Sequence, residues 1–175
     1  PPSWWLNKYP EERALSQNGG TDSISYASKR WVKDVCKYIR AVLEHMKSMP
    51  YAAHIFAVKF AQGATYEWQE YGMEIGNCSD FSTLAQNGFR EFLKEKYKTN
   101  DALQTAWGNG LVTFDNATIP AFGEREPLTY GSLLDGVKQR SVLDYQDFKA
   151  KNVTESILAF SNVVKEVSNG MWLAG

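Results

Sequence analysis

Residues 54–107 constrain the fold of this chain more than any other stretch. They begin with a short apolar run over residues 54–60, which has the length of a strand rather than of a helix. Because this run is apolar on both faces apart from Lys59, it suits a parallel strand that is covered on both sides. A turn rich in glycine and aromatic residues follows, and after it comes amphipathic helical sequence. The order of these elements predicts an α/β fold.

Helical periodicity is clear around this strand. Apolar residues recur at three- and four-residue spacing, opposite charged faces, in three segments: 29–48, 80–97 and 137–168. Ser28 is placed to cap the first segment, and Thr99 or Asn100 is placed to cap a short helix that stops at Gly108. Residues 171–174 have the composition of a second strand, so the chain alternates helices with strands.

The remaining sequence lacks a period. Residues 1–28 contain prolines and the turn sequence Asn18-Gly19-Gly20, and residues 109–136 contain two prolines and four glycines. We therefore expect a single incomplete segment in four stretches: a loop over 1–28, helix–strand–helix–helix over 29–108, a long loop over 109–136, and a long helix with the start of the next strand over 137–175.

Composition excludes several classes of function. Lys and Arg number 19 and Asp and Glu 20, for a net charge of −1, so the basic stripe of a nucleic-acid-binding protein is missing. No apolar stretch approaches the roughly 20 residues that span a bilayer, and we expect no membrane partner. The two cysteines and the two histidines follow no ligand spacing, which predicts neither a metal site nor a cofactor.

Three stretches resemble the family-42 glycoside hydrolases, the β-galactosidase-like members of the clan-A barrels. In that family the fourth barrel strand is followed by an amphipathic helix, a Lys-Tyr-x-Thr turn, a short Ala-Leu helix and a Trp-Gly stop. Residues 89–108, FREFLKEKYKTNDALQTAWG, contain the same pieces in the same order. Residues 1–6 (PPSWWL) resemble the loop after the third strand, and residues 141–145 (SVLDY) resemble the helix that leads to the fifth.

The resemblance implies a helix-rich, partial (β/α)8 (TIM) barrel from about the end of strand 3 to the start of strand 5. A closed barrel takes about 250 residues, more than the 175 present, and both ends resemble internal sequence. It further implies a retaining hydrolase of β-linked sugars, whose acid/base and nucleophile carboxylates lie about 5 Å apart. Because the nucleophile ends strand 7, we expect this chain to carry only the acid/base half and to be inactive alone.

Glu67 is the predicted general acid, because it follows the strand and is flanked by aromatic residues that favour a protonated carboxyl. The alternative for Glu67 is a loop carboxylate paired with a lysine, and Glu70 and Glu74 compete for the catalytic role. In the family this Glu normally follows an Asn, whereas Glu67 follows Tyr66 and the chain contains no Asn-Glu dipeptide.

Aromatic side chains near Glu67 are candidates for sugar binding. Trp68 and Tyr71 could form a flat platform for a pyranose ring, or could pack the loop against the barrel rim. Trp4 and Trp5 carry the same two alternatives, with one of the pair expected in the core. Gln62 is a candidate for a hydrogen bond to a sugar hydroxyl, with a plain turn residue as the alternative.

Other functions stay open from the sequence. A non-catalytic carbohydrate-binding or scaffolding α/β domain would use the same aromatics as its ligand face, and a degenerate barrel would be retained for interaction alone. The expected partners are a carbohydrate substrate and the rest of the parent barrel, and exposed strand edges favour a homo-oligomer. A secreted or periplasmic parent suits polysaccharide degradation, but residues 1–175 contain no targeting signal from which the compartment could be assigned.

Overall fold

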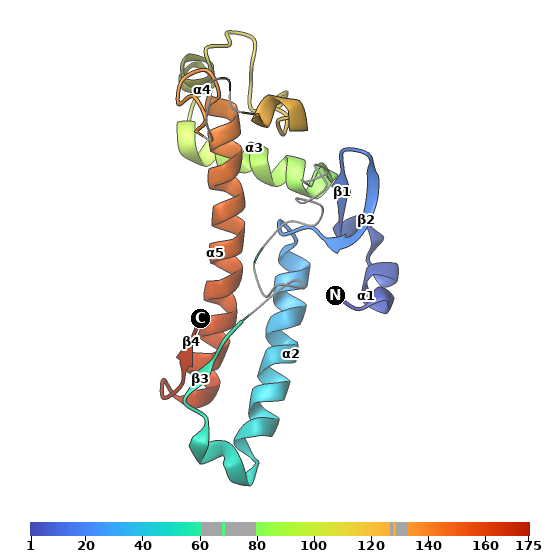
Figure 1. Cartoon of the computed structure of the whole chain (residues 1–175), viewed down its shortest axis with the longest axis vertical. Helices are drawn as coiled ribbons and strands as arrows, with labels where there is room; N and C mark the ends of the chain where they lie inside the picture. Colours follow the sequence, from blue (N-terminus) through green and yellow to red (C-terminus); the bar gives the residue numbers. More distant parts are fainter. Residues whose placement is uncertain (61–67, 69–79, 127, 129–132) are drawn as a thin grey trace. The chain divides into compact units, whose positions relative to one another are not determined.

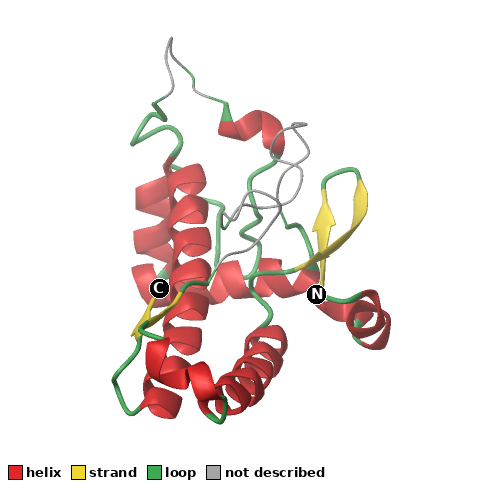
Figure 2. Cartoon of the chain, turned by 60° about the horizontal axis from the view of Figure 1, so that its bottom comes forward, coloured by secondary structure: helices red, strands yellow, loops and turns green. Residues whose placement is uncertain are grey.

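The computed structural model of the chain describes residues 1–60, 68, 80–126, 128 and 133–175. Helices dominate these residues, and the strands among them form two separate two-stranded sheets (Figure 2). The chain divides into two compact units. Unit 1 comprises Pro1–Ala27 and Glu70–Lys151, and unit 2 comprises Ser28–Gln69 and Asn152–Gly175. The long helix α5 (Arg140–Ser168) contributes to both units (Figure 1).

Unit 1 begins with a short helix and a β-hairpin, so the prediction of a loop over residues 1–28 is wrong. The elements are α1 (Ser3–Lys8), η1 (Pro10–Glu12), β1 (Arg13–Ser16) and β2 (Gly19–Ile24). Strands β1 and β2 are antiparallel, with Ser16 opposite Gly19. Gly19 has φ 135°, a conformation that L side chains rarely adopt, and the turn sequence around it therefore closes the hairpin.

Two capped helices follow in unit 1, α3 (Thr83–Tyr97) and α4 (Asn100–Trp107). The Ser82 hydroxyl accepts the Ala85 N–H at 3.2 Å, which is why the helix predicted from residue 80 begins at Thr83. The Thr99 hydroxyl caps α4 in the same way, and Gly108 ends it with φ 61°, both as the sequence predicts.

The connection from α4 to α5 is largely irregular, in agreement with the loop predicted over residues 109–136. Its described part holds one short 3₁₀ helix, η4 (Phe122–Arg125). Helix α5 begins at Arg140 rather than at residue 137. The Asp135 carboxylate accepts the N–H groups of Val137 and Lys138, each at 2.9 Å, and this turn delays the helix.

An aromatic cluster forms the core of unit 1. Phe89 is fully buried, and its ring centroid lies 5.5 Å from that of Tyr145 and 5.6 Å from that of Phe148. Both partners come from the first turns of α5. Leu93 of α3 and Leu103 of α4 are also fully buried in this cluster, so α3, α4 and α5 share one core.

Unit 2 is built as helix, strand, helix, strand. Helix α2 (Lys29–Lys47) is capped by the Ser28 hydroxyl, which accepts the Trp31 N–H at 2.9 Å, as predicted. It leads through η2 (Pro50–His54) to β3 (Ala57–Val58), and the C-terminal part of α5 leads to β4 (Leu173–Ala174). Leu43 of α2 is buried with valines of α5 and with Trp172 in a second core.

Strands β3 and β4 are parallel neighbours, with Ala57 opposite Leu173 and Val58 opposite Ala174. The Leu173 N–H donates to the Phe56 carbonyl at 2.8 Å, and the Phe60 N–H donates to the Gly175 carbonyl at 2.6 Å. The strand predicted over residues 54–60 is shorter than expected: β3 itself covers Ala57–Val58, its hydrogen bonds to the β4 segment reach from Phe56 to Phe60, and His54 ends η2. Parallel neighbours joined by a long connection that contains α5 form a βαβ topology.

Candidate functional site

The predicted catalytic residue lies outside the described part of the chain. Glu67, its competitors Glu70 and Glu74, and the candidate sugar contacts Gln62 and Tyr71 all fall in residues 61–67 or 69–79. Trp68 is described. No described element therefore tests the catalytic assignment, and the surroundings of Trp68 are the part of the predicted site that the structure defines.

Trp68 belongs to an aromatic cluster in unit 2. Its ring stacks on that of Phe160 at a centroid distance of 6.1 Å and meets the edge of Trp31 at 6.5 Å. Phe160 in turn lies 5.6 Å from Phe60, just beyond β3. The cluster joins α2, α5 and the end of the β3 segment, so it fixes the residue that directly follows Glu67.

The two N-terminal tryptophans differ in exposure. Trp5 is 5% exposed and packs against Tyr9 at a centroid distance of 5.1 Å, in line with the expectation that one of the pair is core. Trp4 is 64% exposed. Trp4 is thus the member of the pair with a ring face available to a ligand.

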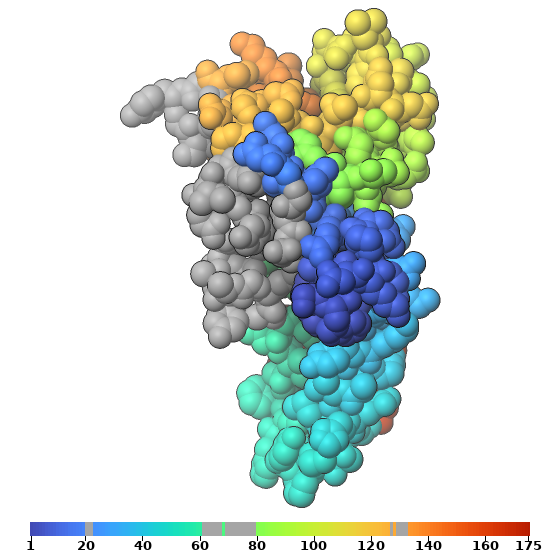
Figure 3. Space-filling model, turned by 90° about the vertical axis from the view of Figure 1, so that its right-hand side faces the viewer, coloured from blue at the N-terminus to red at the C-terminus, as the bar shows by residue number. Residues whose placement is uncertain are grey.

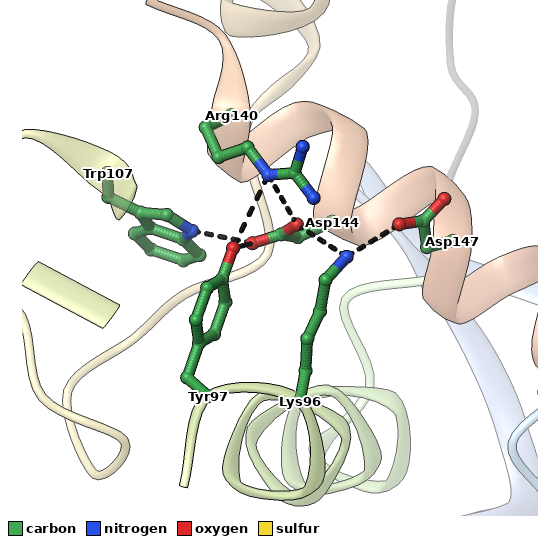
Figure 4. Close-up of polar contacts among 6 residues, drawn as sticks. All are labelled: Lys96, Tyr97, Trp107, Arg140, Asp144 and Asp147. Carbon is green, nitrogen blue, oxygen red and sulfur yellow. Dashed lines mark hydrogen bonds and ion pairs between the residues drawn. The ribbon is translucent and has the colours of Figure 1, made fainter. Parts of the chain in front are cut away.

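A buried carboxylate organises the helices of unit 1 (Figure 4). Asp144 of α5 is fully buried and accepts four hydrogen bonds: from Tyr97 Oη at 2.6 Å, Trp107 Nε1 at 2.8 Å, and Lys96 Nζ and Arg140 Nε at 3.0 Å. Asp147 accepts a further bond from Lys96 at 2.7 Å. The donors come from α3, α4 and α5, so one carboxylate links all three helices.

This network raises the pKa values of two of its donors, Lys96 and Tyr97. Burial lowers the pKa of Lys96, but hydrogen bonds to Asp147 and Asp144 outweigh it and leave the pKa above its usual value. Burial and the hydrogen bond to Asp144 raise the pKa of Tyr97, so its phenol stays protonated. Both shifts favour the forms that donate to Asp144, which stabilises the network as drawn.

Asp80 is a second buried acid that sequence reasoning missed. Its Oδ1 accepts the Leu15 N–H at 3.2 Å and the Ser82 N–H at 2.9 Å, which ties the hairpin to the start of α3. Its Oδ2 is buried and has no partner within the described residues. Sequence separation explains the omission, because Leu15 and Asp80 are 65 residues apart.

The described residues show neither a membrane span nor a metal cluster. None of their helices has the length and apolarity to cross a bilayer. Nor do three or more of their Cys, His, Asp and Glu side chains gather in a geometry that could hold a metal ion.

A family assignment follows from comparison with known proteins. The profile of glycoside hydrolase family 42, described as beta-galactosidase, matches residues 1–174. The chain belongs to glycoside hydrolase family 42. The resemblance inferred from residues 1–6, 89–108 and 141–145 is thereby confirmed.

Individual relatives agree with this assignment. The beta-galactosidase BbgII of Bifidobacterium bifidum is 26% identical over 180 residues, covering 98% of this chain and 24% of the relative. The beta-galactosidase of the psychrophilic Marinomonas ef1 superposes with a TM-score of 0.65 at 22% identity, over 97% of this chain and 24% of that one. The catalytic domain of a beta-amylase from Paenibacillus polymyxa gives a TM-score of 0.70 at 18% identity, over 96% and 43% respectively.

The chain spans about a quarter of the length of the curated relatives it matches. Its fold is a helix-rich α/β segment of a (β/α)8 barrel with an unclosed sheet, as the sequence predicted. The helix–strand–helix–strand order of unit 2 corresponds to the barrel repeat. Unit 1 consists of the chain that precedes α2 together with most of the long connection between β3 and α5 and the N-terminal part of α5.

Proposed function

We propose that this chain is the acid/base-bearing part of a glycoside hydrolase that cleaves β-linked sugars, β-galactosides first among them, with retention of configuration. Membership of family 42 over residues 1–174 carries this proposal. In a retaining mechanism Glu67 would protonate the departing glycosidic oxygen and then deprotonate the attacking water.

The topology around β3 supports Glu67 in this role. In (β/α)8 barrels the catalytic residues come from the carboxyl ends of strands and from the connections that follow them. Residue 67 lies in the connection that follows β3, a strand whose parallel neighbour is β4. A carboxylate in this connection thus belongs to the part of the chain from which such enzymes build their active sites.

Trp68 supports the proposal through its packing. Its ring is held by Phe160 and Trp31, so the backbone next to Glu67 is anchored to an apolar cluster. Apolar surroundings favour the protonated carboxyl that a general acid requires. Trp68, Tyr71, Gln62 and the exposed Trp4 are the proposed sugar contacts, whereas buried Trp5 packs against Tyr9 within unit 1.

The second carboxylate of the mechanism belongs to the part of the family fold that this chain does not span. Retaining hydrolysis needs a nucleophile about 5 Å from the acid. Residues 1–175 alone should therefore bind sugar weakly and not turn it over, and the rest of the barrel is the partner that completes the site.

The test is Glu67→Gln in the full-length protein that carries this sequence. With lactose as substrate we expect kcat to fall about 10²- to 10⁴-fold, the usual contribution of a general acid. An aryl galactoside with a very acidic phenol should lose much less in the first step, because its leaving group needs no proton. Glu70→Gln and Glu74→Gln are matched controls from the same connection and should retain most activity.

Chemical rescue separates the acid from a merely structural glutamate. With the acidic aryl galactoside as substrate, whose phenolate leaves without a proton, azide added to Glu67→Ala should restore turnover and give a glycosyl azide of retained configuration, because azide replaces the base-activated water at the covalent intermediate. Unchanged lactose turnover in Glu67→Gln would refute the assignment, as would an azide product of inverted configuration, which marks a nucleophile.

A further inference from the structure

Unit 1 contains a pocket of about 390 Å³ between the end of α4, residues 109–120 and the first turn of α5. This volume lies in the range of small-molecule sites, about 300–1,000 Å³. Most of its lining residues lie in the loop after α4, and this loop is yellow in Figure 3. Among the described residues of the predicted site, Trp4, Trp5 and Trp68 do not line the pocket. Its chemically distinctive wall consists of Trp107, Asn109, Asn116, Thr118, Glu124 and Ser141.

Hydrogen bonds from α3 and α4 fix the loop that forms this pocket. The Ala117 carbonyl accepts Gln86 Nε2 at 2.8 Å and Arg90 Nε at 3.0 Å, and the Ile119 N–H donates to Gln86 Oε1 at 3.1 Å. Gln104 Nε2 donates to the Val112 carbonyl at 3.0 Å. A wall held by side chains from two helices is preorganised, so a ligand need not order it on binding.

The aromatic side of the pocket is fixed as well. Trp107 Nε1 donates to the buried carboxylate of Asp144 at 2.8 Å, and the ring stacks on Phe89 at a centroid distance of 6.3 Å. This hydrogen bond and this stacking contact fix the orientation of the indole ring, as an aromatic platform for a ligand requires.

The polar groups of the pocket divide into those used by the fold and those left over. Asn109 and Asn116 bond the backbone of their own loop. Glu124 uses Oε2 to accept the Ala121 N–H at 2.6 Å. The hydroxyls of Thr118 and Ser141 make no hydrogen bond to any described residue. Two hydroxyls beside a carboxylate and an indole are thus available to a ligand.

The lining selects a chemical class. No described lining residue is cationic, which disfavours phosphates and carboxylates as ligands. Glu124 is the one acid among the described lining residues, far from the six to eight or so oxygens that a calcium ion takes. An indole face combined with hydroxyls and one carboxylate oxygen instead suits a neutral polyhydroxylated molecule, which has apolar ring faces and many donors.

We infer that this pocket, lined by residues outside the sequence of the proposed catalytic connection, is a second carbohydrate-binding site that holds a neutral sugar unit against Trp107 through the Thr118 and Ser141 hydroxyls. The choice of a galactoside as probe rests on the proposed function, whereas the geometry of the pocket does not. Such a site would hold part of a longer saccharide, or a second one, while Glu67 acts elsewhere.

The test is isothermal titration of the full-length protein with methyl 1-thio-β-D-galactopyranoside, which resists hydrolysis. We expect two binding events per chain. In the double variant Thr118→Ala/Ser141→Ala one of them should weaken about tenfold, as the loss of two modest hydrogen bonds implies. Turnover of a small aryl galactoside should stay unchanged. Thr154→Ala/Ser161→Ala, on α5 outside the pocket, is the matched control.

The outcomes separate this inference from the proposed function. A single binding event in the wild type that the Thr118/Ser141 double variant leaves intact overturns the pocket assignment, whatever Glu67 does. A single event that this variant abolishes, in a protein without turnover, supports the pocket and counts against the catalytic proposal. Equal binding by wild type and double variant, with two events in each, also refutes the pocket.

Discussion

Units 1 and 2 bury their apolar residues in different ways. In unit 1 the helices close around Phe89, Leu93 and Leu103, none of which is exposed. In unit 2 the strand pair leaves Phe56 76% and Leu173 63% exposed, although the helices behind it bury Val164 completely. Both faces of a parallel sheet are normally buried by helices. Exposed apolar residues in unit 1, such as Leu111 and Leu133, lie in the connection between α4 and α5, whereas Phe56 and Leu173 of unit 2 lie at its strand pair.

This difference distinguishes two kinds of structure within one chain. In unit 1, helices α3 and α4 and the start of α5 pack on one another around an aromatic core and the buried carboxylate of Asp144. Unit 2 has the alternation of a barrel wall, whose strands are stabilised by neighbours on both edges. A chain that spans about a quarter of its relatives can complete the first kind of structure but not the second.

The largest expected effect is in the core of unit 1. Phe89→Ala should lower the unfolding free energy of the 175-residue chain by about 4 kcal/mol, because truncating a fully buried aromatic side chain leaves a cavity. Phe56→Ala should change it by less than about 0.5 kcal/mol. Urea denaturation of both variants is the measurement, and equal losses would end the distinction between the units.

Phe56 also sharpens the comparison in the full-length protein. If the rest of the barrel covers this strand, Phe56→Ala should there cost several times more than in the 175-residue chain, since the same ring is then buried. The same small loss in both contexts would show that the exposed face of unit 2 is its native surface.

The second effect concerns the carboxylate network of unit 1. Asp144→Ala should cost about 3 kcal/mol, because Arg140, the Tyr97 phenol and the Trp107 N–H lose their carboxylate acceptor and Lys96 keeps only Asp147. Asp147→Ala removes a largely exposed partner of Lys96 and should cost less than about 1 kcal/mol. Thermal unfolding of the two variants compares the same ion in buried and exposed settings, and similar losses would contradict a central role for Asp144.

Sequence patterns predicted the helices of both units well, for a physical reason. The long helices carry apolar residues at a 3.6-residue period and local caps at Ser28, Thr99 and Gly108, and both signals act within a few residues. The hairpin of unit 1 was missed because β1 has only four residues, too few for alternation to emerge. The parallel β3–β4 pairing agrees with the barrel order that the resemblance implies, but its register depends on residues more than a hundred positions apart and could not be predicted.

The site was less predictable than the fold. Asp144 lies in a stretch that resembles family 42, yet its partners Lys96 and Trp107 are 48 and 37 residues away, and no local spacing reveals them. The pocket beside Trp107 depends equally on long-range packing. Glu67 and Trp68 were identified because the strand, turn and aromatic residues are adjacent in sequence. Their catalytic roles stay predictions.

Association of the 175-residue chain tests the exposed strands of unit 2 directly. We expect it to form dimers or larger species at micromolar concentration, because the uncovered strand pair offers apolar side chains and free edges. Phe56→Lys/Leu173→Lys should give a monomer by size-exclusion chromatography with light scattering. Leu111→Lys/Leu133→Lys replaces two leucines of unit 1 that are 85% and 84% exposed, and it should leave the association unchanged. A monomeric 175-residue chain without substitutions would refute the prediction.

The smallest expected effect is a loss of stability at alkaline pH that originates in unit 1. The folded-state pKa values of Lys96 and Tyr97 are raised above their usual 10.5 and 10.0, so the folded chain holds both protons more tightly than the unfolded chain. Their contribution to the unfolding free energy is complete below about pH 10 and is lost as the pH rises through the raised pKa values of the folded state. Tyr97→Phe should be less stable at neutral pH, but its unfolding free energy should fall less steeply between pH 10 and 12.

A second alkaline contribution comes from unit 2. There, burial raises the pKa of the Cys36 thiol above its usual 9.0, so in Cys36→Ala the unfolding free energy should fall less steeply only where the decline begins, near pH 9. Urea titrations across this range separate the two contributions, and an unaltered slope in Tyr97→Phe would show that the phenol does not control the alkaline limit of unit 1.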